Sequence, residues 1–337
     1  MLPTADTREA RGLPLKAILG LLTLGVLGGV LALERALPPR DERFVVIHSD
    51  DAGMYPSVNQ ATIDAMERGI VSSCSILVPC PAFEEFAHYA AAHPEKDFGI
   101  HLDLTCEKET DRWGPVLGRV RVPSLVDSHG FFWRYAEETA SHAKIEEVDA
   151  ELRAQIERCK NAGVRLSHLD HHMFVLCKRP DFLRLYVRLG LEYDLPIRYS
   201  SAMPAPDDLD PNTPELVTAY REGLTILQSR GMPVFATIDT DNYQVPAPDK
   251  RRYYFDLFRK LGPGVSEILI HCAYGPPGPL HAPGVERREA DTRVFMSQDT
   301  SDELRRRGIR VISWRAFRQM HAEKQRSNPL KSLSGGE

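Results

Sequence analysis

The chain has 337 residues, of which 42% are hydrophobic and 26% are charged, and its formal net charge is -5. This composition is ordinary for a globular fold, and the length suits one large α/β domain or two small ones. The mild acidic balance argues against a nucleic-acid-binding protein, which would present a basic face.

The N-terminal part of the chain contains an apolar segment. Residues 17–33 carry no charged side chain, and they follow a short basic segment, 1–16, that contains Arg8, Arg11 and Lys16. An apolar run of about 17 residues is at the lower limit for a helix that spans a bilayer. Basic residues before an apolar run are also typical of a secretory signal. We find no clear small-x-small cleavage site, so we predict an uncleaved transmembrane anchor over 17–34, whereas cleavage would give a secreted protein.

The charge pattern around this segment predicts its orientation. Because basic residues flank the apolar run on its N-terminal side, we expect the N-terminus in the cytoplasm and the main domain outside it. A membrane partner is therefore predicted through this helix alone.

After a proline-rich joint at 37–43, β-type and helical patterns alternate along the chain. We expect strands at Phe44–His48, Cys74–Val78, Phe98–Leu104, Val164–Asp170, Ile197–Tyr199, Pro233–Ile238, Glu267–His271 and Ile309–Ser313. We expect helices at 57–69, 83–92, 145–163, 181–189, 214–229, 250–261 and 302–307. Ser57 is the expected N-cap of the first helix, and Gly69 its C-cap.

This alternation predicts a parallel sheet covered by helices. The number and spacing of the segments favour an irregular (β/α) barrel of seven to eight mostly parallel strands over residues 42–320, preceded by the one N-terminal hydrophobic helix. Residues 107–144 lack the alternation, and we interpret them as an inserted loop or cap over one end. The polar residues 325–337 are expected to form a disordered tail.

The six cysteines form no C-x-x-C pair, so a structural zinc site or a thioredoxin-like motif is not predicted. We expect free, buried thiols. A disulfide such as Cys74–Cys80 stays open at this point.

Polar residues gather at the carboxyl ends of four predicted strands, where the chemistry of a parallel α/β fold lies. Side chains two apart in a strand point to the same face. The residues are Asp50 and Asp51 after the first strand, His101 and Asp103 on one face of the third, His168, Asp170 and His172 on one face of the fourth with His171 on the other, and His271 at the end of the seventh.

A divalent cation explains these residues together. A single histidine at a strand end is usually structural, a role that we assign to His48, and an aspartate pair is often only a helix cap. Histidines that gather at the ends of several strands of one sheet are not explained in this way. A carboxylate and two imidazoles can instead hold a metal, with positions left for water and substrate. The cation would also offset the cost of adjacent acids, with one acid bound to it and the other free as a base.

Three stretches carry a family resemblance. The sequences HSDDAGMYPSVNQATIDAMERGIVSSCSILV, FGIHLDLT and SHLDHHMF resemble those of the YdjC-like carbohydrate deacetylases, which are related to the polysaccharide deacetylases. The resemblance covers roughly residues 43–317. It implies an irregular (β/α) barrel and a divalent metal ion, Mg²⁺ or Zn²⁺.

The resemblance also implies roles for single residues. Metal ligands are expected at Asp51, His101 and His172. Asp50 matches the catalytic base of the family, and His271 matches a late histidine that is a candidate general acid. By softness, two nitrogens and one oxygen suit zinc, nickel or iron better than magnesium.

The chain departs from the family pattern in three places, one of which is the string of histidines after the fourth strand, shortened here to DHHMF. Ala52 replaces the aromatic residue of the usual H-A-D-D-F-G, and the late motif is IHCAYG instead of C-H-P-G. We therefore expect the same ligands around a different substrate pocket.

The predicted function is metal-dependent hydrolysis of N-acetyl groups on an amino-sugar-containing carbohydrate or glycolipid. A metal-bound water is the expected nucleophile, Asp50 takes its proton, and His271 protonates the leaving amine. Asp103 and Asp170 either orient the two histidine ligands or pair with basic residues. The sequence does not specify the sugar or the acyl group, and a homo-oligomer stays open.

Three alternatives remain. One is another divalent-metal hydrolase, an amidase or esterase. A second is a non-haem iron oxygenase that uses His101 and Asp103 as part of a two-histidine, one-carboxylate triad. A third is a non-catalytic, membrane-anchored carbohydrate-binding module.

Overall fold

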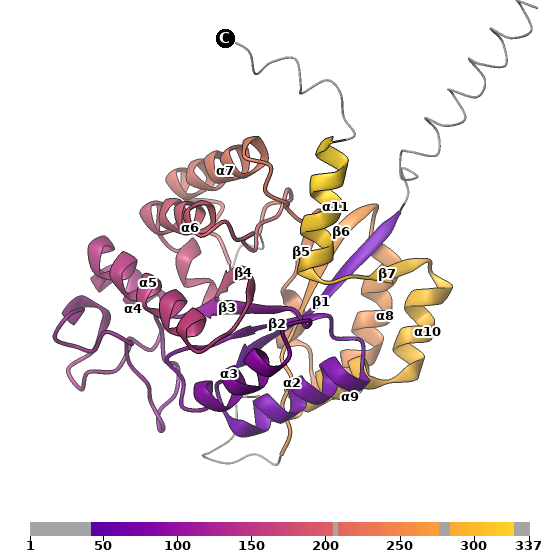
Figure 1. The fold of residues 1–337 in the computed structure, drawn as a ribbon, viewed down its shortest axis with the longest axis horizontal. Helices are drawn as coiled ribbons and strands as arrows, with labels where there is room; N and C mark the ends of the chain where they lie inside the picture. Colours follow the sequence, from indigo (N-terminus) through magenta and orange to yellow (C-terminus); the bar gives the residue numbers. More distant parts are fainter. Residues whose placement is uncertain (1–41, 205–207, 276–283, 327–337) are drawn as a thin grey trace, which may run out of the picture. The chain divides into compact units, whose positions relative to one another are not determined.

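The computed structural model describes residues 42–204, 208–275 and 284–326 (Figure 1). The predicted anchor at 17–34 and the basic segment before it lie outside these residues. Within the described ranges, no helix is both long enough and apolar enough to cross a membrane.

One parallel sheet organises the described chain (Figure 1). Its strands are β1 (Arg43–Ala52), β2 (Ser73–Ile76), β3 (Phe98–Leu102), β4 (Leu166–His171), β5 (Thr237–Asp239), β6 (Gly264–Ile270) and β7 (Ile309–Val311). The order is β4-β3-β2-β1-β6-β5, and β7 pairs with the first half of β1. All of these pairings are parallel, as the alternation of strands and helices predicts.

The sheet is curled, but strand pairing does not close it into a barrel. The predicted strand at Ile197–Tyr199 makes only isolated bridges, one from Ile197 to β4 and one from Ser200 to Phe235. Few residues are extended here, and the preceding Pro196 has no N–H to donate to a ladder. The prediction of seven to eight mostly parallel strands in an α/β fold is therefore confirmed with seven strands, whereas barrel closure and the strand at Ile197–Tyr199 are wrong.

Helices flank the sheet on several sides (Figure 1). They are α2 (Pro56–Arg68), α3 (Phe83–Ala92), α4 (Ala136–His142), α5 (Ile145–Asn161), α6 (Pro180–Glu192), α7 (Pro214–Ser229), α8 (Lys250–Lys260), α9 (Val285–Met296), α10 (Gln298–Arg306) and α11 (Trp314–Arg326). Short 3-10 segments are η1 (Pro123–Leu125), η2 (His172–Cys177), η3 (Asp241–Gln244) and η4 (Ala247–Asp249).

Most predicted helices are present within a few residues of their expected ends. The first begins at Pro56 with Tyr55 as its N-cap, two residues before the predicted cap Ser57, because proline is favoured at the first helical position. Helix α9 was not predicted. Its buried face carries Arg288, Asp291 and Thr292 among apolar residues, so it shows no clear apolar stripe.

The inserted segment 107–144 contains only η1, α4 and irregular chain, which agrees with the missing alternation. It is packed onto the rest of the fold. Cys106 N donates to Trp133 O at 2.8 Å, and the Glu151 side chain of α5 accepts from the backbone N–H groups of Val116 and Leu117. At the other end of the chain, α11 continues to Arg326, so residues 325 and 326 of the predicted tail are helical; the remainder lies outside the described residues.

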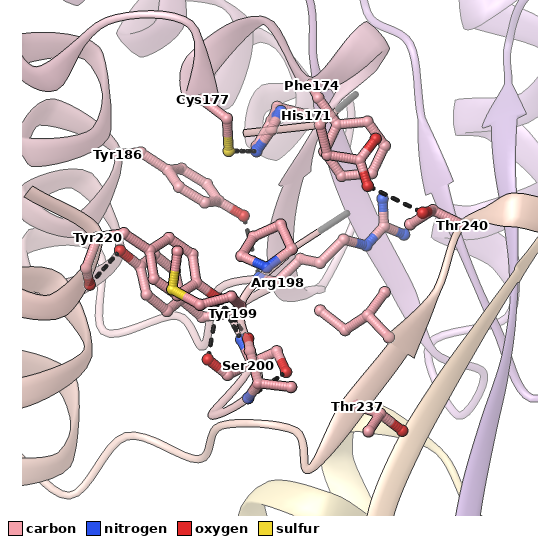
Figure 2. Close-up of a pocket in the computed structure, with 15 residues that line it drawn as sticks. His171, Phe174, Cys177, Tyr186, Arg198, Tyr199, Ser200, Tyr220, Thr237 and Thr240 are labelled. Carbon is pink, nitrogen blue, oxygen red and sulfur yellow. Dashed lines mark hydrogen bonds between the residues drawn. The ribbon is translucent and has the colours of Figure 1, made fainter. Parts of the chain in front are cut away.

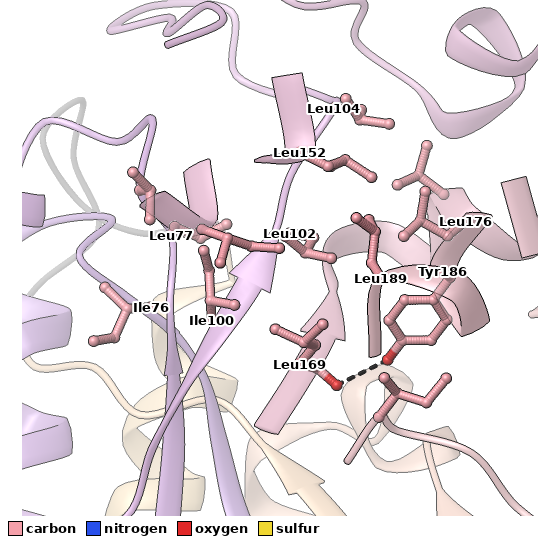
Figure 3. Packing of buried hydrophobic residues seen from close by; sticks show 14 of the residues in the cluster. Ile76, Leu77, Ile100, Leu102, Leu104, Leu152, Leu169, Leu176, Tyr186 and Leu189 are labelled. Atoms are coloured by element: carbon pink, nitrogen blue, oxygen red, sulfur yellow. Dashed lines mark hydrogen bonds between the residues drawn. The ribbon is translucent and has the colours of Figure 1, made fainter. Parts of the chain in front are cut away.

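A hydrophobic core fills the space between β2–β4 and the helices that follow them (Figure 3). Leu102 and Leu169 come from the sheet, and Leu152 and Leu189 come from α5 and α6. Tyr186 is also buried here, and its hydroxyl donates to Leu169 O at 2.8 Å. All six cysteines are buried and free, so the open Cys74–Cys80 disulfide is not formed.

Candidate active site

Asp50 and Asp51 lie near the carboxyl end of β1 and are both buried. The pairing of β1 with β2 shifts register between Ser49 and Ala52, which marks a bulge. Asp51 has a φ of 71°, in the left-handed region that residues other than glycine rarely adopt. Bulges and such strained residues re-aim side chains at functional sites. The bulge therefore explains how two adjacent acids bind different partners.

Asp51 meets the two predicted histidine ligands. Its Oδ1 lies 3.5 Å from Nε2 of His101 and 3.3 Å from Nδ1 of His172. Ligand atoms of these three residues all lie within 4.8 Å of one another, and all three side chains are buried. The Oδ1 atom accepts no hydrogen bond within the described part of the chain. A buried, unsatisfied carboxylate oxygen between two imidazole nitrogens fits a divalent cation.

The other nitrogen of each ring lies beside a carboxylate. His101 Nδ1 is 2.7 Å from Asp170 Oδ1, and Arg198 Nη2 is 2.8 Å from Asp170 Oδ2, so Asp170 both orients a histidine and pairs with a basic residue. Asp103 does not orient a histidine: it accepts from Trp113 Nε1 at 2.7 Å and from Thr105 N at 2.9 Å. This arrangement also removes the support for the iron-oxygenase alternative, which needs Asp103 as a ligand.

Asp50 binds a buried arginine that the sequence did not reveal. Arg198 Nη1 and Nη2 donate to its two oxygens at 3.1 and 2.7 Å. The same guanidinium lies 2.8 Å from Asp170 and 3.0 Å from Glu267. The only signal in the sequence was an arginine in the middle of the short predicted strand Ile197–Tyr199.

The charges in this cluster decide how its acids titrate. Burial by itself would raise the pKa of Asp50, but the positive charges of Arg198 and His101 outweigh it and hold that pKa below its ordinary value. Burial raises the pKa of Glu267 to about 7, although Arg198 opposes the shift. Asp50 therefore stays ionised at neutral pH, as a base must.

His271 and Arg288 lie on the other side of Asp51. His271 Nε2 is 3.9 Å from Asp51 Oδ2, and Arg288 Nη2 donates to the same oxygen at 2.7 Å. Burial and the charge of Arg288 lower the pKa of His271 to about 3. The resting imidazole is therefore neutral, and it must gain a proton before it can act as a general acid.

Two further clusters in the described ranges also bring three potential ligands together: Asp50 with His101 and Asp170, and His48 with His168 and Asp170. Both are less suited to a cation. Arg198 already lies against Asp50 and Asp170. The ring nitrogens of His48 lie 2.6 Å from Ser73 Oγ and 3.1 Å from Ser75 Oγ, and the His168 ring stacks on Trp314 at 4.5 Å.

Replacing His172 with alanine distinguishes among these clusters. We expect a marked loss of affinity for divalent metal, because His172 belongs only to the cluster around Asp51. The dissociation constant of the purified protein for Zn²⁺ measures the effect. Replacement of His88, an exposed residue of α3, serves as the control. Unchanged affinity in the His172 variant would exclude it as a ligand.

A cavity of about 220 Å³ lies next to Arg198, which forms part of its wall (Figure 2). Aromatic side chains supply much of the remaining lining: Phe174, Tyr186, Tyr199 and Tyr220. His171, the last residue of β4, also lines it. The turn after β4 carries two consecutive left-handed residues, Met173 and Phe174, with φ values of 51° and 49°. This strained turn joins His172, in the cluster around Asp51, to Phe174 in the cavity wall.

Comparison with known proteins identifies relatives over most of the chain. The sequence model of the family described as YdjC-like protein matches residues 44–306. A carbohydrate deacetylase of Geobacillus stearothermophilus is 27% identical over 282 residues, which cover 82% of this chain and 98% of that protein. A carbohydrate deacetylase of Brevibacillus brevis is 36% identical over 155 residues, but this alignment spans 46% of this chain and only 58% of that protein.

The fold also has a solved relative. The crystal structure of an Enterococcus faecalis protein, described as a cellobiose-phosphate cleavage protein, is similar with a TM-score of 0.66 and 25% sequence identity. The similarity covers 82% of this chain and 98% of that one.

Proposed function

This chain belongs to the YdjC-like protein family, and we propose that it is a metal-dependent hydrolase that removes N-acetyl groups from an amino-sugar-containing carbohydrate or glycolipid. Several curated relatives are carbohydrate deacetylases. The observation that carries the proposal is the buried cluster of Asp51, His101 and His172 around an unsatisfied carboxylate oxygen.

The three clustered side chains would hold the ion. A bound divalent cation supplies Lewis-acid polarisation of the amide carbonyl and lowers the pKa of a coordinated water. The donor set of two imidazoles and one carboxylate favours zinc, nickel or iron on softness, whereas the family resemblance favours Mg²⁺ or Zn²⁺. We keep both Mg²⁺ and Zn²⁺ as candidates.

Asp50 is suited to the role of general base. Its carboxylate lies 3.7 Å from the Nε2 atom of His101, the nitrogen that would face the ion. The bidentate contact with Arg198 fixes its orientation and keeps it ionised. Asp50 would take a proton from the attacking water, a role that contributes roughly 100- to 10,000-fold to the rate.

His271 is the candidate for the proton donor to the amine. Amide hydrolysis adds water across the C–N bond, so the proton that leaves the water must finally reach the nitrogen. Because burial and Arg288 keep the resting ring of His271 neutral, the proton that Asp50 takes from the water would have to pass to His271 before His271 gives it to the amine nitrogen and returns to its neutral form. Arg288 holds Asp51 Oδ2 beside this ring.

Acetate release by the purified full chain tests the function. The protein is stripped with a chelator, re-supplied with one divalent metal at a time and offered a panel of N-acetylated oligosaccharides and glycolipids. We expect no acetate from the stripped protein and restored release with Zn²⁺ or Mg²⁺, because the three ligands alone cannot activate water. Tight metal binding without acetate from any substrate would favour a different metal hydrolase.

A further inference from the structure

The two histidines of the cluster present opposite ring nitrogens to Asp51. His101 faces it with Nε2, and His172 faces it with Nδ1. The remaining nitrogen of His101 lies 2.7 Å from Asp170, and that of His172 lies 3.2 Å from Oε2 of Glu107. A neutral imidazole has one N–H, so donation of that hydrogen to the outer carboxylate leaves a lone pair directed toward Asp51.

We propose that Glu107 is a positioning residue of the metal site, which holds the His172 ring with Nδ1 free to bind the ion. This inference rests on the proposed metal ligands. A carboxylate behind a metal-bound histidine fixes its tautomer and ring orientation and raises its basicity. Asp170 does the same for His101, so both histidines have an acidic partner on the far side of the ring.

Glu107 differs from Asp170 in its place in the fold. Asp170 is part of β4, at the centre of the buried cluster, whereas Glu107 is the first residue of the inserted segment 107–144. The local backbone is tied down, because Cys106 N donates to Trp133 O at 2.8 Å and Arg134 Nη2 donates to Glu107 O at 3.4 Å. The inserted segment thereby contributes a carboxylate to the metal site as well as covering the fold.

The test compares Glu107→Ala and Glu107→Gln with Glu109→Ala in the full chain. Glu109 is a matched control, because it lies two residues away in the same segment but has an 82% exposed side chain. The readouts are the dissociation constant for Zn²⁺, from competition with a chromophoric chelator, and the melting temperature of the metal-free protein. Loss of such a partner weakens metal binding by roughly 10- to 100-fold.

We expect a loss of this size for alanine and a smaller loss for glutamine, since the glutamine Oε1 accepts the same hydrogen bond without the charge. Glu109→Ala should stay within about twofold of the wild-type affinity, because an exposed ion pair contributes little. The loss of metal affinity should be larger than the change in the melting temperature of the metal-free protein would explain.

Three outcomes would contradict the inference in different ways. Wild-type affinity in Glu107→Ala overturns it directly. The inference is also overturned if metal affinity falls in parallel with the melting temperature of the metal-free protein and Glu107→Gln loses as much affinity as Glu107→Ala. That result would show a purely structural role. A wild-type protein that binds no divalent ion overturns the proposed metal site together with this inference. By contrast, weaker binding in Glu107→Ala supports the inference even if the protein releases no acetate, because the readout is binding.

Discussion

Replacing Asp50 with asparagine should lower turnover by at least about 100-fold, the lower end of the contribution of a general base, while the metal content stays near normal. Asparagine keeps the shape of the side chain and can still accept a hydrogen bond from Arg198, but it cannot take a proton from water. The distances place Asp51, not Asp50, between the two histidine nitrogens, so the ion should remain bound.

The measurement pairs the steady-state rate of acetate release with metal analysis of the same sample. Asp149→Asn, in a partly exposed acid on α5, is the matched control and should leave both quantities unchanged. Retained activity would remove Asp50 from the mechanism. A joint loss of activity and metal would instead make Asp50 a ligand, through the alternative cluster with His101 and Asp170.

Replacing Arg198 with methionine should destabilise the fold by about 3–5 kcal/mol, the cost of removing one partner from a buried ion pair. The guanidinium is buried and lies between three acids, Asp50, Asp170 and Glu267. Methionine fills similar space but leaves these carboxylates without a counter-charge. The free energy of unfolding from denaturant titration measures the effect.

The destabilisation should depend on pH in a defined direction. The pKa of Glu267 is already raised by burial to about 7, above its ordinary value. A group with a raised folded-state pKa stabilises the fold when protonated, and this stabilisation is lost as the pH rises through that pKa. Without Arg198 the pKa of Glu267 should rise further. The variant should therefore lose more unfolding free energy, relative to the wild type, at about pH 8 than at about pH 6.

An exposed ion pair provides the control for this prediction. Arg184 pairs with Glu222 on the surface, where its side chain is 55% exposed. Arg184→Met should therefore change the unfolding free energy by less than about 1 kcal/mol at either pH. If Arg198→Met behaves like this control, the three acids must be stabilised in some other way, for example as protonated groups.

Local sequence patterns alone determined much of this protein. Alternating β and α segments predicted the parallel sheet and most helices, because hydrophobic periodicity is a property of neighbouring residues. The same patterns placed Asp51, His101 and His172 at the carboxyl ends of three strands of one sheet. The tertiary structure then brings these three side chains to within 4.8 Å of one another.

The tertiary structure alone decided which charged groups support that cluster. Arg198 is 148 residues from Asp50, Glu107 is 65 residues from His172, and Arg288 is 237 residues from Asp51. No short-range pattern links such pairs, since each contact depends on the curl of the sheet, the course of the inserted segment or the packing of α9. The sequence also could not show that a bulge at Asp51 separates two adjacent acids, because that conformation is imposed by the pairing of β1 with its neighbours.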